Sequence, residues 1–212
     1  TADSFVFIIL GAALSFGLAA ALTFFFGIPK EENKPSRAED ESGENENNSE
    51  TAALSDKSVA VKTEMTVYSP IPGSVIPLSE IPDEAFSSGA MGQGVGIVPA
   101  EGKVYAPFDG TVEMVFDTKH AIGLTSSDGV SLLIHVGLDT VELNGQYFTA
   151  HVSAGDPIKK GQLLLEFDLD KIAEKYKTVT PVLVVNTDDY TSVNGISGMT
   201  ADNETPVIKI DA

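Results

Sequence analysis

The segment HAIGLTSSDGVSLLIHVGLD, from His120 to Asp139, has the pattern of two β-strands joined by a tight turn. In its second half, VSLLIHV (130–136), the even-numbered residues are all aliphatic, so they share one face of a strand and His135 points to the other. The stretch SSDG (126–129) supplies the polar and glycine residues that reverse a chain. The segment therefore predicts a β-hairpin.

Two of the three histidines in the chain stand at the open end of this predicted hairpin. If the turn is symmetric about the Ser127–Asp128 bond, with a loop of two or four residues, His120 lies directly opposite His135. Side chains that oppose each other in this way have Cβ atoms about 4.5 to 5.5 Å apart, so two imidazoles could share one small ligand. A slip of one residue would break the pairing, which leaves two ordinary histidines as the alternative.

A histidine pair has three chemical uses: metal binding, general acid–base work, or carriage of a phosphoryl group on one ring while the other stabilises it. A zinc peptidase with a β-rich fold would need HxxxD and HxH motifs, but Leu124 and Gly137 stand where the second ligands would be. The chain has no cysteine, which excludes disulfides, thiolate metal sites and cysteine nucleophiles.

The region around the hairpin consists of short β-type runs separated by glycine and proline turns. These runs are SVIPL, GVGIV, KVYAP, TVEMVF, AIGLT, VSLLIHV, QLLLEF, PVLVVN and PVIKI. Only LDKIAEKYK, Leu169 to Lys177, has helical spacing. We expect an all-β domain over 65–212, an antiparallel sandwich or barrel-like fold with one short helix.

The first 64 residues have a different composition. From Phe5 to Gly27 there are 23 residues without a charge or a proline, which is enough to cross about 30 Å of hydrocarbon as a helix. A secretory signal is the alternative, but the segment lacks a basic n-region and a small-residue cleavage site. We predict a transmembrane helix over 1–29 and a flexible acidic linker over 30–64, with weak support from Lys30 and Lys34 for a cytoplasmic side beyond the span.

The net negative charge of the chain limits the classes of macromolecule that it is expected to bind. The chain has a formal net charge of −18, and residues 65–212 carry 20 acidic against 8 basic side chains. A surface of this sign repels phosphate backbones, so we expect no nucleic-acid partner. It is compatible with a basic protein partner and a fast, salt-sensitive encounter.

From Tyr68 to Ile210 the chain resembles the enzyme IIA domain, glucose class, of the bacterial sugar phosphotransferase system. The runs that carry the resemblance are SPIPGSVIPLSEIPDEAF, KVYAPFDGTV, TKHAIGL, GVSLLIHVGLDTVELNGQYF, AGDPIKKGQLLLEFDLDKI, TPVLVVNTDDY and TPVIKI, of which HVGLDTVEL is the most specific. The resemblance implies a cytoplasmic β-sandwich that takes phosphate from the phosphocarrier protein HPr and passes it to a cysteine of a IIB domain.

The resemblance also implies roles for individual residues. His135 corresponds to the phosphoryl acceptor, modified at Nε2, and His120 to the second histidine that stabilises the phosphoryl group. Thr118 and Asp139 match two further active-site positions, whereas His151 has no counterpart and is interpreted as an ordinary polar residue. Apolar residues around the pocket are expected to form the surface that docks partners, namely Phe86, Phe116 and Val141. No cofactor and no metal are expected.

A hydrophobic span followed by a linker and a IIA domain resembles the end of a IIB-IIC-IIA transporter of the β-glucoside, sucrose or trehalose type. In that arrangement residues 1–29 end the IIC membrane domain, the IIB cysteine precedes Thr1, and the IIA domain lies on the cytoplasmic side of the cell membrane. A homodimer formed through IIC is compatible with it. The alternative function is a non-catalytic regulatory module of IIA type that binds other transporters or enzymes.

Overall fold

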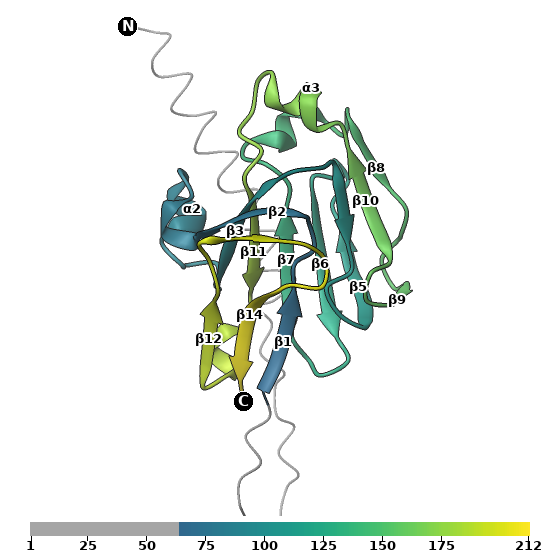
Figure 1. Cartoon of the computed structure of the whole chain (residues 1–212). Helices are drawn as coiled ribbons and strands as arrows, with labels where there is room; N and C mark the ends of the chain where they lie inside the picture. Colours follow the sequence, from purple (N-terminus) through teal and green to yellow (C-terminus); the bar gives the residue numbers. More distant parts are fainter. Residues whose placement is uncertain (1–63) are drawn as a thin grey trace, which may run out of the picture. The chain divides into compact units, whose positions relative to one another are not determined.

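The structure is a computed structural model that describes residues 64–212 (Figure 1). The predicted membrane span and all but the last residue of the predicted linker lie outside these residues. Within residues 64–212, no helix combines the length and the apolar character that crossing a membrane requires. The first described strand begins at Glu64, the last residue that we assigned to the linker.

Antiparallel strands make up most of the described chain. They are β1 (Glu64–Tyr68), β2 (Gly73–Pro77), β3 (Gln93–Pro99), β4 (Lys103–Tyr105), β5 (Gly110–Val115), β6 (Ala121–Ser126), β7 (Ser131–His135), β8 (Phe148–Ala150), β9 (Pro157–Ile158), β10 (Leu163–Phe167), β11 (Thr180–Val184), β12 (Ser192–Gly195), β13 (Met199–Ala201) and β14 (Pro206–Asp211). The helical elements are α2 (Glu84–Ser87), α3 (Leu169–Ala173) and the short 3₁₀ turns η1 (Leu78–Glu80), η2 (Thr140–Leu143) and η3 (Thr187–Asp189).

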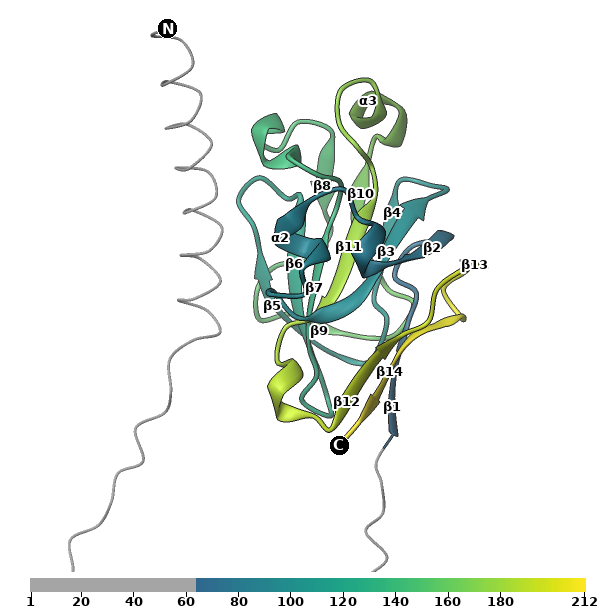
Figure 2. The ribbon, with the colours of Figure 1, turned by 90° about the vertical axis from the view of Figure 1, so that its left-hand side faces the viewer.

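The strands form three sheets (Figures 1 and 2). The largest has the order β13-β2-β3-β11-β7-β6-β5-β9, and the two small ones have the orders β1-β14-β12 and β4-β10-β8. The strand pairs within residues 64–212 are all antiparallel. The prediction of a mainly antiparallel β domain with little helix is confirmed.

The helices differ from the prediction in two ways. The predicted helix over 169–177 is shorter, because α3 ends at Ala173 with Glu174 as its C-cap. Helix α2 was not predicted; Asp83 caps it by accepting a hydrogen bond from the backbone N–H of Ala85. With four residues, α2 is too short for a 3.6-residue period to appear in the sequence.

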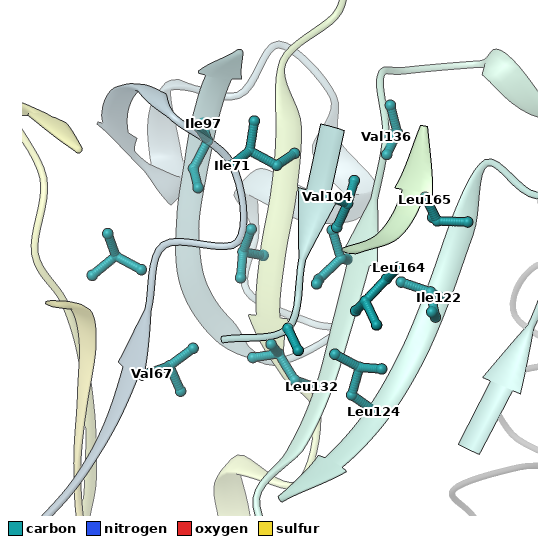
Figure 3. Packing of buried hydrophobic residues seen from close by; sticks show 14 of the residues in the cluster. Val67, Ile71, Ile97, Val104, Ile122, Leu124, Leu132, Val136, Leu164 and Leu165 are labelled. Carbon is teal, nitrogen blue, oxygen red and sulfur yellow. The ribbon is translucent and has the colours of Figure 1, made fainter. Parts of the chain in front are cut away.

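One hydrophobic core joins the three sheets (Figure 3). In β6 and β7 the cross-strand pairs Ile122–Ile134 and Leu124–Leu132 lie in it, each side chain 1% exposed or less. Burying such a side chain stabilises the fold by about 1.5 to 3 kcal/mol. These residues occupy one face of β7 and hold the strand firmly, so that His135 projects from the other face of a rigid element.

Candidate active site

The turn between β6 and β7 has three residues, Ser127 to Gly129. The N–H of Ser126 donates to the carbonyl of Val130 at 2.9 Å, and the N–H of Gly129 donates to the carbonyl of Ser126 at 3.0 Å. Gly129 has φ 90°, as expected for the last residue of a three-residue hairpin loop. The expected loop of two or four residues is therefore wrong, and the register is shifted by one residue.

The shift changes the partner of each histidine. His135 lies opposite Ala121, and the N–H of Val136 donates to the carbonyl of His120 at 2.7 Å. The prediction that His120 and His135 oppose each other in the ladder is wrong. Their rings nevertheless meet, with centroids 4.7 Å apart and planes at 79°.

The rings can meet because both histidines stand where the ladder ends. β6 begins at Ala121, directly after His120, and β7 ends at His135. Before His120 the chain turns tightly: Lys119 has φ 56° and donates its N–H to the carbonyl of Phe116 at 2.7 Å. His120 lies outside the ladder, where strand alternation no longer dictates the direction of a side chain. The predicted proximity of the two imidazoles is thus confirmed by a different geometry.

His135 has a defined tautomer. Its Nδ1 lies 2.8 Å from the carbonyl oxygen of Gly137. A carbonyl oxygen only accepts hydrogen bonds, so Nδ1 carries the proton and donates it. In the neutral ring Nε2 then has a free lone pair, which is the form of imidazole that can attack an electrophile.

His120 is held by Thr118, whose Oγ1 lies 2.5 Å from the Nδ1 of the imidazole. The His120 side chain is 2% exposed and Thr118 is half-buried. Thr118 and His120 flank Lys119 in the tight turn, so the turn places hydroxyl and ring together. Thr118 and His120, both predicted site residues, are thereby in direct contact, and the ring of His120 contacts that of His135.

Both imidazoles are shifted toward the neutral form. Burial, together with the smaller effect of the neighbouring His135, lowers the pKa of His120 to about 3. Burial also lowers the pKa of His135, opposed by the hydrogen bond to Gly137 and by the negative charges of Asp83 and Asp139. Two uncharged rings in contact can bind and transfer a group without first losing protons to solvent.

This arrangement predicts a specific dependence of stability on pH. Below pH 6.5 the unfolded chain takes up protons on these histidines that the folded chain does not, so the free energy of unfolding falls as the pH falls. Each histidine contributes up to about 1.4 kcal/mol per pH unit, and for His120 the loss continues until the pH nears its folded pKa. Urea unfolding at pH 7, 6 and 5 should give a steeper fall for the natural chain than for a His120→Gln, His135→Gln double variant; equal slopes would contradict the neutral pair.

Gly137 is required by the loop that follows β7. Its φ is 73°, and a Cβ there would lie 2.6 Å from Thr140 Cγ2 and 2.9 Å from the carbonyl oxygen of Lys177. The neighbouring Leu138 donates its N–H to that same carbonyl at 2.9 Å. The backbone of Lys177 therefore cannot easily move away from an added methyl group. The acceptor for the His135 proton thus sits in a tightly confined turn.

We expect Gly137→Ala to destabilise the fold more than the matched change Gly155→Ala. Both glycines have positive φ, but an added Cβ on Gly155 meets nothing within 4 Å. The control should cost about 1 kcal/mol from backbone strain, and Gly137→Ala about 3 kcal/mol once the steric clash is added. Denaturant unfolding measures both; equal costs would show that the loop yields freely.

Two phenylalanines form walls of the site. The ring of Phe86, from α2, lies 5.1 Å from that of His135, and the ring of Phe116 lies 5.5 Å from that of His120. Figure 2 shows α2 lying over one face of the large sheet. Phe86 is 2% exposed, and its predicted contact with a docking partner stays a prediction. Its side chain packs in a second hydrophobic cluster, on the face of the sheet where His135 projects. The buried members of this cluster are Leu78, Ile81, Phe86, Leu138, Val179 and Leu183.

The remaining predicted site residues are exposed or half-buried. Asp139 is exposed, with φ 59°, and acts on His135 through its charge. Val141 in η2 and Phe116 are half-buried. His151, directly after β8, pairs with Glu166 of β10 at 2.7 Å. In the part of the chain that is described, no three His, Cys, Asp or Glu side chains are grouped to hold a metal ion.

Asp83 was missed by the sequence analysis. It caps α2, and its charge acts on His135. The signal was present in PDEAF (82–86), because an aspartate followed by glutamate in the first turn is a helix-start pattern. Nothing local, however, indicates that this helix start faces a histidine 52 positions later.

Comparisons with known proteins converge on one family. Residues 65–190 match the family described as phosphoenolpyruvate-dependent sugar phosphotransferase system, EIIA 1. The PTS system beta-glucoside-specific EIIBCA component of Dickeya chrysanthemi is 40% identical over 203 residues, covering 95% of this chain and 31% of that protein. The PTS system glucose-specific EIICBA component of Staphylococcus saprophyticus is 50% identical over 150 residues, covering 70% of this chain and 22% of that protein.

A solved structure agrees. Glucose permease IIA from Mycoplasma capricolum superposes with a TM-score of 0.65 at 30% sequence identity, covering 69% of this chain and 96% of that one. The chain spans about a third or less of the length of the two curated relatives.

Proposed function

The chain belongs to the phosphoenolpyruvate-dependent sugar phosphotransferase system EIIA 1 family, and from this membership we propose that His135 carries a phosphoryl group between two proteins. The donor is phosphorylated HPr, and the acceptor is the cysteine of a IIB domain, which then phosphorylates a sugar during uptake. The observation that carries the proposal is the hydrogen bond from His135 Nδ1 to Gly137, since it leaves Nε2 free beside a second imidazole.

The chemistry follows from this tautomer. In the first step the Nε2 lone pair bonds to phosphorus, and the bond between phosphorus and the donor histidine breaks with its electron pair returning to that donor nitrogen. In the second step the IIB thiolate bonds to phosphorus and the Nε2–P bond breaks, returning its electron pair to His135. Gly137 keeps the Nδ1 proton in place throughout, so His135 ends each cycle as it began.

His120 serves the second step in this proposal. If Thr118 donates its hydroxyl proton to Nδ1 of His120, the neutral ring holds its own proton on Nε2 and can donate it to a phosphoryl oxygen. The charge of the bound phosphoryl group raises the pKa of His120, which brings a positive charge beside it. The two histidines thus have complementary tautomers, one nucleophilic and one donating.

Docking of partners rests on charge and on a small apolar rim. Asp139 is exposed beside His135 and would meet cationic groups of HPr, while the half-buried Phe116 and Val141 would supply apolar contact. The acidic character of the domain would speed encounter with a basic partner at low salt.

The extent of the two matches supports the domain order IIB-IIC-IIA for the whole transporter. A match over 95% of the chain to an EIIBCA component must reach well into residues 1–63, whereas the match to an EIICBA component covers only 70%. In the first order IIA follows IIC directly. We therefore propose that residues 1–29 end a IIC membrane domain, that IIA lies on the cytoplasmic side, and that any homodimer forms through IIC.

The proposal is tested by phosphate transfer. The full chain in mild detergent is incubated with radioactive phospho-HPr and then with the IIB domain of the same transporter. We expect acid-labile, base-stable label on the chain that IIB removes. A chain that takes no label, or whose label IIB leaves in place, would contradict the proposed function.

A further inference from the structure

The end of β7 is shaped by a side chain that the mechanism above does not use. Val136 donates its N–H to the carbonyl of His120, but its own carbonyl oxygen accepts from Thr140 Oγ1 at 2.6 Å. The Thr140 side chain is 0% exposed. The buried hydroxyl of Thr140 therefore provides the hydrogen bond to the Val136 carbonyl at the point where the regular β6–β7 pairing ends.

The chain then folds back on itself within three residues. Gly137 has φ 73° and Asp139 has φ 59°, two left-handed residues around Leu138. This reversal brings the carbonyl of Gly137 to within 2.8 Å of Nδ1 of His135, two residues earlier.

The methyl group of Thr140 is also placed against the turn. A Cβ on Gly137 would lie 2.6 Å from Thr140 Cγ2, so methyl and glycine are in close contact. Thr140 thus touches the turn twice: its hydroxyl holds the Val136 carbonyl on one side of Gly137, and its methyl packs on Gly137 itself.

We propose that Thr140 is a positioning residue for phosphoryl transfer: its hydroxyl bond to the Val136 carbonyl holds the turn that aims the Gly137 carbonyl at Nδ1 of His135. The inference rests on the proposed function of His135. By fixing that turn, Thr140 fixes the tautomer in which the nucleophilic lone pair is on Nε2. Without it the Gly137 carbonyl can swing away, and a proton on Nε2 would block attack.

The test compares Thr140→Val, which keeps the shape and loses the hydroxyl, with Thr140→Ser, which keeps the hydroxyl. ¹⁵N NMR of the His135 ring reports the tautomer, and labelling by phospho-HPr reports the rate. Thr140→Val should show a population with the proton on Nε2 and accept phosphate about tenfold more slowly, the equivalent of about 1.4 kcal/mol. Thr140→Ser should retain the natural tautomer and most of the rate.

Ser69→Ala is the matched control, because Ser69 is also a buried hydroxyl that donates to a carbonyl, that of Ile71 at 2.7 Å. It should leave tautomer and rate unchanged. A folded Thr140→Val variant with the natural tautomer and rate would overturn the inference.

A measurement on the natural chain covers the case in which Thr140→Val does not fold. The Thr140 hydroxyl proton should exchange slowly enough with water to be visible by NMR, and a rapidly exchanging proton would overturn the inference. If the natural chain takes no phosphate from HPr, the proposed function fails; the ring tautomers of the natural chain and its variants then still decide whether Thr140 holds the turn.

Discussion

Replacing His135 with glutamine abolishes phosphorylation of the chain by phospho-HPr. Glutamine has a similar length and can still donate a hydrogen bond toward Gly137, but its amide nitrogen has no lone pair that attacks phosphorus. The expected loss is at least on the order of 1,000-fold, because no other nucleophile takes the place of Nε2 and removal of a catalytic group that acts covalently is rarely compensated.

The matched control for this variant is His151→Gln. His151 is exposed, 37% by its side chain, and pairs with Glu166 away from the two buried rings. Labelling should be unchanged in the control. Full labelling of His135→Gln, or loss of labelling in His151→Gln, would show that the phosphoryl acceptor is not His135.

Replacing His120 with glutamine has a different expected result: the chain accepts phosphate but passes it to IIB on the order of 100-fold more slowly, the usual cost of removing one donor from a transition state. In the first step the attacking ring of His135 is neutral and meets little repulsion from the phosphoryl oxygens. In the second step a thiolate anion approaches a negatively charged group, and only a positively charged neighbour offsets that repulsion. Glutamine can donate a hydrogen bond but cannot become charged.

Single-turnover kinetics separates the two steps. The chain is first loaded from phospho-HPr, and the decay of label is then followed after addition of IIB. Thr118→Val, which removes the hydroxyl that orients His120 without removing its ring, should slow the decay less than His120→Gln does. Equal decay rates in the natural chain and in His120→Gln would show that His120 does not assist the transfer.

The faces of β7 could be predicted from sequence because alternation is a local property. The residues of VSLLIHV alternate between the main core and the second face, with Leu132 and Ile134 on one side and His135 on the other, and the structure keeps that division. No distant contact was needed for the prediction. Burial of one face is strong enough to decide the orientation of the whole strand.

The register could not be predicted in the same way. A turn of two, three or four residues fits SSDG, and the choice depends on tertiary contacts: Ser127 donates its N–H and its hydroxyl to the carbonyl of Asp109, 18 residues earlier. That contact comes from the start of β5 and has no signature near the turn. The inferred histidine pair was right only because His120 lies just outside the ladder, where its ring can turn toward that of His135.

Phe86 shows a second limit. An apolar residue in a glycine- and proline-rich segment can be an exposed docking contact or part of a core, and composition does not distinguish them. The short helix α2 turns it inward, so that its ring packs against that of His135. Asp83, which begins that helix, became recognisable as an electrostatic neighbour of His135 only once the helix was placed.

The central claim is that Nε2 of His135 bonds to phosphorus while Nδ1 keeps its proton on Gly137. The most direct test is ³¹P–¹⁵N correlation NMR of the ¹⁵N-labelled chain after loading from phospho-HPr. We expect phosphorus coupled to Nε2 of His135, with Nδ1 protonated in the same ring. Phosphorus coupled to Nδ1 of His135, or to a nitrogen of His120, would contradict the account.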